Sequence, residues 1–196
     1  MSLIDRILHV AYRCHDAKQT VEWYEKHLGM NFVLAIAENE VPSTRAPDPY
    51  MHVFLDAGNG NVLAFFELPC QPEMGRDENT PAWVQHLALK VDSVETLLAA
   101  KARLEAAGIE VVGPTDHTIF KSIYFFDPNG IRLELSAQVA DEFEMMEESK
   151  VAHSRLKEWN ARKEQWRQDR AAGKATAPLK PQQNDRPEVT AAQQAH

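Results

Sequence analysis

The stretch HVAYRCHDAKQTVEWYEKHLGM, residues 9–30, decides the fold because its plan recurs in HLALKVDSVETLLAAKARLEAAGI, residues 86–109. Each copy starts with a histidine in a short alternating strand, continues into an amphipathic helix and ends at a glycine that can adopt the positive φ of a helix stop. Asp16 is the predicted N-cap of the first helix, and Asp92 with Glu95 forms a predicted capping box for the second. This internal repeat predicts two copies of one module.

Three strand candidates follow each predicted helix. They are residues 30–37, 51–58 and 61–68 in the first half and 109–113, 122–126 and 131–135 in the second. The sequences GNGN and DPNG join the last two strands of each half, and both are typical of tight turns. The chain therefore predicts an α+β fold of paired βαβββ modules, about residues 4–70 and 82–137, within one domain that spans residues 1–140.

The composition changes near residue 140. Residues 141–172 are rich in charge and contain no Pro or Gly, which predicts a surface helix with a weak apolar stripe through Ala152, Leu156, Trp159 and Trp166. We expect this C-terminal helix to lie on the domain, and binding to a partner subunit is the alternative. Residues 173–196 contain three prolines and few large apolar side chains, which predicts a disordered tail.

Composition and charge exclude several classes of protein. The 196 residues are 44% hydrophobic, enough for a core, and their net charge of −8 argues against a nucleic-acid partner. Cys14 and Cys70 form no CxxC motif, which favours a reducing compartment. The start of the chain does not resemble a signal peptide, and no apolar run approaches the ~18 residues of a membrane span. We therefore expect a cytoplasmic protein with no membrane partner.

Four strands each carry one imidazole or carboxylate opposite an apolar face that suits helix packing. These side chains are His9, Glu67, His86 and Glu134, and in the strand of Glu67 the face of Val62, Ala64 and Phe66 is the one expected to meet helices. A carboxylate that faces a sheet interior is costly unless it is paired or bound to a cation. Imidazole and carboxylate suit Fe(II), Mn, Ni, Co or Zn. The residues alone leave open whether they form one metal site or four separate structural or solvated groups.

Residues 4–137 resemble the vicinal oxygen chelate superfamily, through the segments ILHVAYRCHDAKQTVEWYEKHLGM, LAFFEL, VQHLALKV and YFFDPNGIRLEL. This superfamily includes glyoxalase I, extradiol dioxygenases, fosfomycin-modifying thiol transferases and methylmalonyl-CoA epimerases. The resemblance implies curved sheets around a divalent metal, and the metal-ligand positions of the family fall on His9, Glu67, His86 and Glu134. It also implies a small-molecule substrate and a homodimer, since related folds form domain-swapped dimers.

The stretch DHTIFKSIYFFDPNG, residues 116–130, adds His117 and Tyr124 as catalytic candidates. Its pattern resembles the small extradiol catechol dioxygenases, in which the histidine at this place acts in acid–base and oxygen chemistry. The run KSIYFFDPNG also resembles the fosfomycin thiol transferases, so Tyr124 does not discriminate between activities. The structural alternatives are a loop histidine at a strand entrance and a core aromatic residue with a wetted hydroxyl.

The number of protein ligands separates two activities that the resemblance implies. An extradiol-type dioxygenase would hold Fe(II) with His9, His86 and Glu134, leaving positions for a catechol and dioxygen. A glyoxalase I-like lyase or isomerase would use all four residues around Ni or Zn and act through an enediolate. The chain lacks the histidine that extradiol enzymes often carry shortly before the second metal-binding histidine, and no basic cluster is evidently placed for glutathione. We expect the dioxygenase with Fe(II); Ni, Zn or Mn, and a glyoxalase or thiol transferase, are the alternatives.

Overall fold

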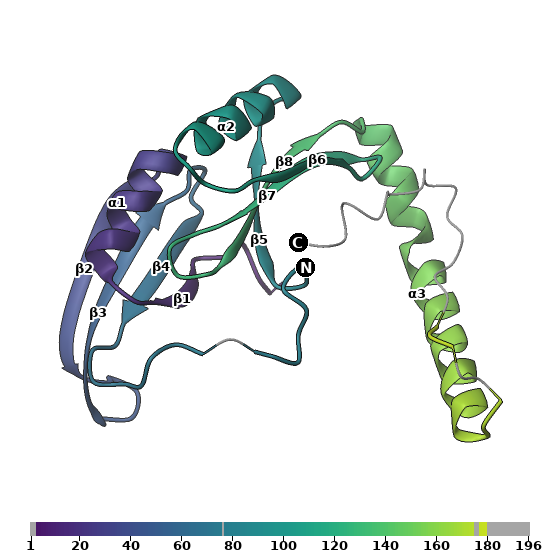
Figure 1. Ribbon diagram of the computed structural model, residues 1–196, viewed down its shortest axis with the longest axis horizontal. Coiled ribbons are helices and arrows are strands. Elements are labelled where there is room, and N and C mark those ends of the chain that lie inside the picture. The colour runs from purple at the N-terminus through teal and green to yellow at the C-terminus, as the bar shows by residue number, and fades with distance from the viewer. Residues whose placement is uncertain (1–2, 76, 175–176, 180–196) are drawn as a thin grey trace. The chain divides into compact units, whose positions relative to one another are not determined.

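The computed structural model describes residues 3–75, 77–174 and 177–179. The elements, in chain order, are β1 (Val10–Cys14), α1 (Ala17–Leu28), β2 (Asn31–Glu40), β3 (Pro47–Asp56), β4 (Val62–Glu67), β5 (His86–Val91), α2 (Val94–Ala106), β6 (Val112–Asp116), β7 (Phe120–Phe126), β8 (Arg132–Gln138) and α3 (Glu142–Ala171). The order βαβββ occurs twice and a helix follows (Figure 1). The predicted α+β fold of paired modules with a C-terminal helix is therefore confirmed.

Each module forms a four-stranded mixed sheet, with the orders β1-β4-β3-β2 and β5-β8-β7-β6. In the first sheet β1 pairs in parallel with β4, and β3 pairs antiparallel with both β4 and β2. The chain also falls into two compact units. One contains residues 1–89, 101–111 and 124–134, and the other contains residues 90–100, 112–123 and 135–196.

Helix α1 covers one face of the first sheet because its apolar side chains point to β3 and β4. The Tyr24 ring lies 5.1 Å from the Phe65 ring, and both side chains are fully buried. The predicted ends of α1 are confirmed: the Asp16 carboxylate accepts a hydrogen bond from the Gln19 amide at 2.7 Å, and Gly29 ends the helix at φ 67°. The local sequence thus sets both the length of α1 and the face that it buries.

The start of α2 and the strand after it differ from the prediction. The Thr96 amide donates to the Ser93 hydroxyl at 3.1 Å, so Ser93 caps α2 and the predicted capping box of Asp92 with Glu95 is wrong. The strand predicted at 109–113 is β6 at Val112–Asp116. The reason is that the Ile109 amide still bonds back to the Leu104 carbonyl, which closes the helix at 3.0 Å.

Helix α3 starts with a capping box in which Asp141 and Glu144 bond each other's backbone amides. It buries none of its side chains, and Leu156 and Trp159 are exposed by 64% and 45%. No helix in the described ranges is both long enough and apolar enough to cross a membrane. The predicted disordered tail, residues 173–196, lies largely outside the described residues.

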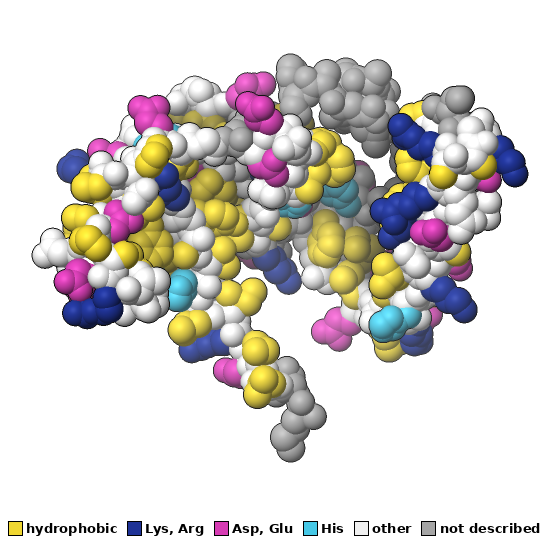
Figure 2. Space-filling model, turned by 90° about the horizontal axis from the view of Figure 1, so that it is seen from below, with side chains coloured by type: hydrophobic (Ala, Val, Ile, Leu, Met, Phe, Trp, Pro, Cys, Tyr) yellow, Lys and Arg dark blue, Asp and Glu magenta, His cyan; other side chains and the backbone are white. Residues whose placement is uncertain are grey.

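Hydrophobic side chains also reach the surface in the segment before β1. Leu3, Ile4, Ile7 and Leu8 are each exposed by 65% or more. Figure 2 shows hydrophobic groups at the surface among charged ones. Because exposed apolar clusters of this kind often mark contact sites for other molecules, this segment is a candidate contact surface.

A buried polar network joins the turn before β8 to α1 and to His15 just before it. The amides of Asn129 and Ile131 each donate to Asp127 Oδ1 at 2.8 Å, and the Tyr24 hydroxyl donates to Asp127 Oδ2 at 3.1 Å. The Asn129 side-chain oxygen in turn accepts from the His15 amide at 2.9 Å. Burial raises the pKa of Asp127, and the hydrogen bonds that its carboxylate accepts oppose that rise. This one carboxylate therefore orders the turn and anchors it to the helix.

We predict that Asp127→Ala lowers the free energy of unfolding by about 2–3 kcal/mol, because it leaves buried donors without acceptors. The matched control is Asp77→Ala, since Asp77 accepts hydrogen bonds from Asn79 and Thr80 in the same local manner but in solvent. Its replacement should change stability by less than about 1 kcal/mol. Urea unfolding followed by circular dichroism measures both, and equal losses would contradict the assigned role of Asp127.

Candidate metal centre and adjoining pockets

His86 and Glu134 form the closest pairing of predicted metal donors. His86 begins β5, Glu134 lies on the neighbouring strand β8, and His86 Nε2 is 3.0 Å from Glu134 Oε2. The other ring nitrogen, Nδ1, is 3.1 Å from the carbonyl oxygen of Val84, which can only accept. A proton on Nδ1 leaves Nε2 as an acceptor facing a carboxylate, so the pair requires a second proton or a cation between the two atoms. The donor chemistry of this pair therefore fits a divalent metal.

Tyr124 lies beside this pair. Its ring centre is 6.0 Å from that of His86 in an edge-to-face arrangement, and the Arg132 guanidinium lies 4.5 Å from the centre of the Tyr124 ring. Glu134 is 7% exposed, so water reaches its carboxylate poorly. A phenol at this place can donate a hydrogen bond to an oxygen of a bound molecule. The structure thus brings together three of the predicted site residues, His86, Tyr124 and Glu134.

His9 lies immediately before β1, next to an aromatic cluster. Its ring centre is 6.1 Å from that of His52 and 5.8 Å from that of Phe54, and the His52 ring stacks on Phe66 at 3.6 Å. His52 is 9% exposed, and burial lowers its pKa, with a smaller contribution from the charge of His9. The sequence reasoning missed His52. The feature that could have indicated it is a single histidine within the otherwise apolar strand sequence MHVFL.

Glu67 lies on the opposite face of the first sheet from His9. The parallel register sets Val10 beside Leu63, and alternation then places Leu63, Phe65 and Glu67 on one face while His9 falls on the other. Phe65 packs against α1, so the carboxylate shares the helix-packing face. The prediction that the face of Val62, Ala64 and Phe66 meets the helix is therefore wrong. Alternation shows that the two faces of a strand differ but does not show which of them a helix covers.

The Glu67 carboxylate accepts a hydrogen bond at the N-terminus of α1. Its Oε2 atom accepts a hydrogen bond from the Ala17 amide at 2.7 Å. The first amides of a helix have no partner within the helix, and its N-terminus favours negative charge. Glu67 therefore has a structural partner, and the structure does not bring it together with the histidines.

The described chain does not bring the four predicted donors together. Over residues 3–75, 77–174 and 177–179, no three His, Cys, Asp or Glu side chains lie close enough to hold one metal ion. Two donors form the His86–Glu134 pair, His9 lies in the aromatic cluster, and Glu67 bonds a helix. His117 belongs to the other compact unit, in the turn between β6 and β7, where its amide donates to the Phe120 carbonyl at 2.8 Å. Its proposed catalytic role stays a prediction.

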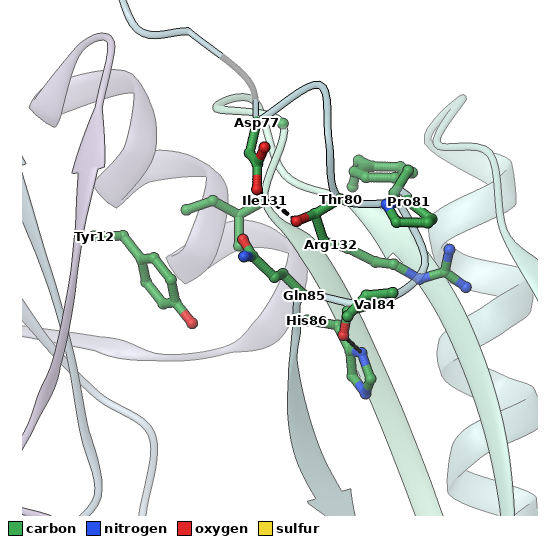
Figure 3. A pocket seen from close by; sticks show the side chains of 12 residues that line it. Tyr12, Asp77, Thr80, Pro81, Val84, Gln85, His86, Ile131 and Arg132 are labelled. Atoms are coloured by element: carbon green, nitrogen blue, oxygen red, sulfur yellow. Dashed lines mark hydrogen bonds between the residues drawn. The ribbon is translucent and has the colours of Figure 1, made fainter. Parts of the chain in front are cut away.

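A cavity of about 470 Å³ adjoins His86. Figure 3 shows Tyr12, Gln85 and Asp77 around it, with Ile131 and Pro81 supplying apolar wall. Its lining also includes Thr80, Ala82, Val84, Phe126, Gly130 and Arg132. Apolar walls with a few polar groups are typical of sites for small organic molecules.

A second cavity, of about 690 Å³, lies on the side of the first sheet that carries Phe66, Tyr50 and Arg13. The Arg13 guanidinium donates to the Pro72 carbonyl at 2.6 Å, and its Nε atom is buried without a hydrogen-bond partner. In the part of the chain that the structure describes, no carboxylate forms an ion pair with Arg13. The cavity therefore offers an aromatic wall together with one cation, Arg13, and one carboxylate, Asp48, a feature that the sequence reasoning missed.

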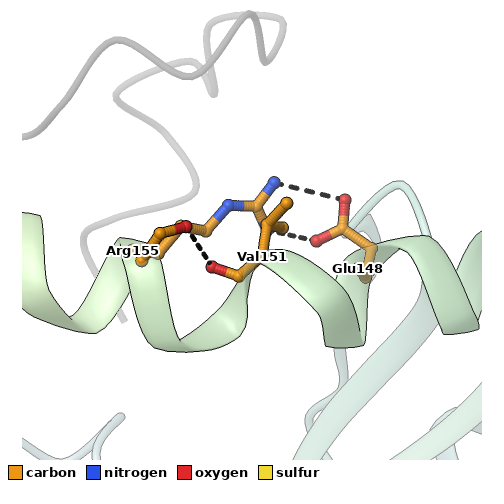
Figure 4. Close-up of polar contacts among 4 residues, drawn as sticks. Glu148, Val151 and Arg155 are labelled. Carbon is orange, nitrogen blue, oxygen red and sulfur yellow. Dashed lines mark hydrogen bonds and ion pairs between the residues drawn. The ribbon is translucent and has the colours of Figure 1, made fainter.

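Charged side chains of α3 form ion pairs with one another along the helix. Arg155 pairs with both carboxylate oxygens of Glu148, and the Ser154 hydroxyl donates to the Val151 carbonyl at 2.9 Å (Figure 4). Lys150 likewise pairs with Glu147. The helix thus presents a solvated, ion-paired surface, which agrees with its lack of buried side chains.

A model of the Glyoxalase/Bleomycin resistance protein/Dioxygenase superfamily matches residues 6–135. Among curated proteins, MhqA of Bacillus subtilis (strain 168), a predicted ring-cleaving dioxygenase, is 30% identical over 84 residues. That match covers 43% of this chain and 27% of MhqA, so the chain spans about a quarter of the length of that relative.

Solved structures share the fold. The glyoxalase family protein from Enterococcus faecalis is 27% identical, with a TM-score of 0.51 over 69% of this chain and 99% of that one. The trypanothione-dependent glyoxalase I of Leishmania major is 24% identical, with a TM-score of 0.52 over 81% and 99% of the two chains. A glyoxalase/bleomycin resistance protein/dioxygenase domain from Frankia sp. EAN1pec is 20% identical, with a TM-score of 0.55 over 69% and 98%. The last two are similar in fold alone.

We predict that Glu67→Ala lowers the free energy of unfolding by about 1–2 kcal/mol, because the Ala17 amide loses its acceptor. Glu67→Gln keeps an acceptor oxygen and should lose less. The matched control is Glu22→Ala, which removes an exposed ion pair with Lys18 on the surface of the same helix and should cost about 0.5 kcal/mol or less. Chemical denaturation measures all three.

The same variants separate a structural role of Glu67 from metal binding. In titrations with Co(II), Glu67→Ala should bind as the wild type does, and Glu134→Ala should bind more weakly. A loss of affinity in Glu67→Ala that matches the loss in Glu134→Ala would make Glu67 a metal ligand after all.

Proposed function

Because the chain belongs to the Glyoxalase/Bleomycin resistance protein/Dioxygenase superfamily, we propose that it is a divalent-metal-dependent extradiol-type dioxygenase that cleaves the ring of a catechol-like aromatic compound. The observation that carries this proposal is the hydrogen bond of Glu67 to the N-terminus of α1. With Glu67 so used, the family's ligand positions leave two imidazoles and one carboxylate, the donor set of non-haem Fe(II) oxygenases. The partial similarity to MhqA supports the same reaction class.

The residues proposed to hold the metal are His9, His86 and Glu134. When bound there, Fe(II) would supply open coordination positions at which a catechol and dioxygen can meet. The Val84 carbonyl fixes the ring orientation of His86, because it accepts from Nδ1 and leaves Nε2 for the metal. The low exposure of Glu134 limits competition from water for its carboxylate.

The remaining residues act on the substrate. Tyr124, beside His86, donates a hydrogen bond to a substrate oxygen, and Arg132 above its ring limits the motion of the phenol. The cavity of about 470 Å³ next to His86 accommodates the aromatic ring, with Phe126 in its wall. His117 is the proposed acid–base group of the reaction.

The protein acts as a homodimer in which His9 of one copy completes the metal site formed by His86 and Glu134 of the other. Two observations support this assembly. No three donors of the described chain come within reach of one ion. The segment before β1 also exposes the large apolar side chains of Leu3, Ile4, Ile7 and Leu8, next to His9.

A second candidate function, isomerisation of the glyoxalase type with Ni or Zn, is favoured by Arg13. Its guanidinium forms no ion pair in the described residues and lines the cavity of about 690 Å³ together with Asp48. A planar cation of this kind suits the carboxylates of a glutathione adduct. This function needs the metal as a Lewis acid and no oxygen.

We predict that the protein reconstituted anaerobically with Fe(II) consumes oxygen when it is given a catechol. His117→Ala should keep its iron and lose about 10²–10⁴-fold in rate, because a positioned acid–base group contributes about that factor. The matched control is His153→Ala, which changes an exposed histidine on α3 and should have no effect. An oxygen electrode and iron analysis measure the two properties.

The same preparations test the second candidate. If Ni or Zn supports isomerisation of the methylglyoxal–glutathione adduct while Fe(II) supports no oxygen uptake with any catechol, the dioxygenase proposal fails. Loss of that isomerisation in Arg13→Gln would then assign the glutathione carboxylates to Arg13.

We predict that His9→Ala and His86→Ala, each inactive alone, regain activity when they are unfolded and refolded together. A mixed dimer keeps one complete site only if His9 and His86 come from different copies. About a quarter of the wild-type rate is expected, because random pairing makes half of the dimers mixed and each mixed dimer has one site of two. Absence of activity in dimers that demonstrably exchange subunits would place the whole site within one copy.

A further inference from the structure

His52 has a buried nitrogen with no hydrogen-bond partner. The residue is 9% exposed, and Nε2 is buried without a partner in the described chain. Leaving such an atom unpaired destabilises the folded protein relative to a satisfied one. An apolar ring at the same place would avoid this cost, because the neighbours Phe54 and Phe66 are apolar and the latter stacks on the imidazole. Packing alone therefore does not account for a histidine here.

His9 is the polar neighbour of this ring. The His52 and His9 rings meet at 68° with their centres 6.1 Å apart, and the second ring that contacts His9 is that of Phe54, which carries no acceptor. The His9 ring makes no hydrogen bond within the described residues. A small rotation of the exposed His9 side chain, or one bridging water, would join the two imidazoles.

We propose that His52 is a positioning residue for His9. When His9 binds the metal through one ring nitrogen, its other N–H is donated to the buried acceptor of His52. This inference rests on the proposed function, in which His9 is a metal ligand. A metal-binding histidine needs a partner of this kind because the hydrogen bond fixes the tautomer and the orientation of the ring. Glu67, the carboxylate expected near His9, cannot be that partner because it lies on the other face of the sheet.

Two substitutions separate positioning from packing. His52→Phe keeps an aromatic ring in the cluster and removes the acceptor. His52→Gln loses the ring and keeps a polar group near the place of Nε2. The matched control is His27→Phe, since His27 is also buried and contacts the Trp23 ring at 5.2 Å, away from any predicted donor. If His52 only packs in the cluster, Phe should preserve metal binding better than Gln. If His52 positions His9, Gln should preserve it better than Phe.

The readout is Co(II) affinity, measured by calorimetry on the metal-free proteins, together with the visible spectrum of the bound ion. His52→Phe should weaken binding by about 10–100-fold and alter the spectrum, as the loss of such an outer partner does. His52→Gln and His27→Phe should stay within about threefold of the wild type. Equal affinities for the wild type and His52→Phe would overturn the inference and leave the proposed function intact. If the wild type binds no metal, both are overturned.

A measurement on the wild type keeps the proposal testable if His52→Phe does not fold. In the Zn(II)-loaded protein, the proposal requires an imidazole N–H proton that exchanges slowly with solvent and is absent from His9→Ala. Detection of that resonance by NMR supports the hydrogen bond, and its absence from the folded, loaded wild type overturns it.

Discussion

The unpaired amides at the N-terminus of α1 are the constraint on which the first unit depends. Helices leave their first N–H groups without internal partners, so side chains from elsewhere must supply acceptors. Here Glu67 on β4 accepts from the Ala17 amide, the first of the helix. Asn129, in the turn before β8, accepts from the amide of His15, the residue before the N-cap. The two contacts join residues that are 50 and 114 positions apart in the sequence. The start of α1 and the residue before it therefore hold a strand and a turn in place, and Glu67 is removed from the proposed set of metal ligands.

The same turn connects the two strands that carry the candidate site residues Tyr124 and Glu134. Asp127 orders the turn with its buried carboxylate, and Tyr124 and Glu134 lie on the two strands that this turn connects. The turn is thus held by hydrogen bonds that are independent of any metal. On β8, beyond the turn, Glu134 approaches His86 to 3.0 Å between a carboxylate oxygen and an imidazole nitrogen, and this pair is where the proposed cation would bind. In the proposed function, stability and reactivity therefore share one hairpin but depend on different carboxylates, Asp127 and Glu134.

Membership of the superfamily establishes the fold but not the reaction, because one fold can support several reactions when a few residues change. For the proposed metal site, the number of protein donors is what distinguishes the two candidate reactions. Because Glu67 lies on the helix side of β4, three candidate donors remain. A carboxylate on the other side of β4 would make four. The buried His52 near His9 further distinguishes this first sheet, since a neutral imidazole can hold a ligand in place without adding charge.

The sequence by itself determined the repeated modules, the cap and stop of α1 and the residue types that could bind a metal. These features depend on neighbours a few residues apart, so periodicity and turn chemistry reveal them. Only the tertiary structure decided which face of β4 meets α1, because alternation is the same for either choice. The structure also shows that Ser93, and not Asp92, caps α2, through a local hydrogen bond from the Thr96 amide. The placement of Glu67 and His52 follows from contacts between distant strands, which no local pattern encodes.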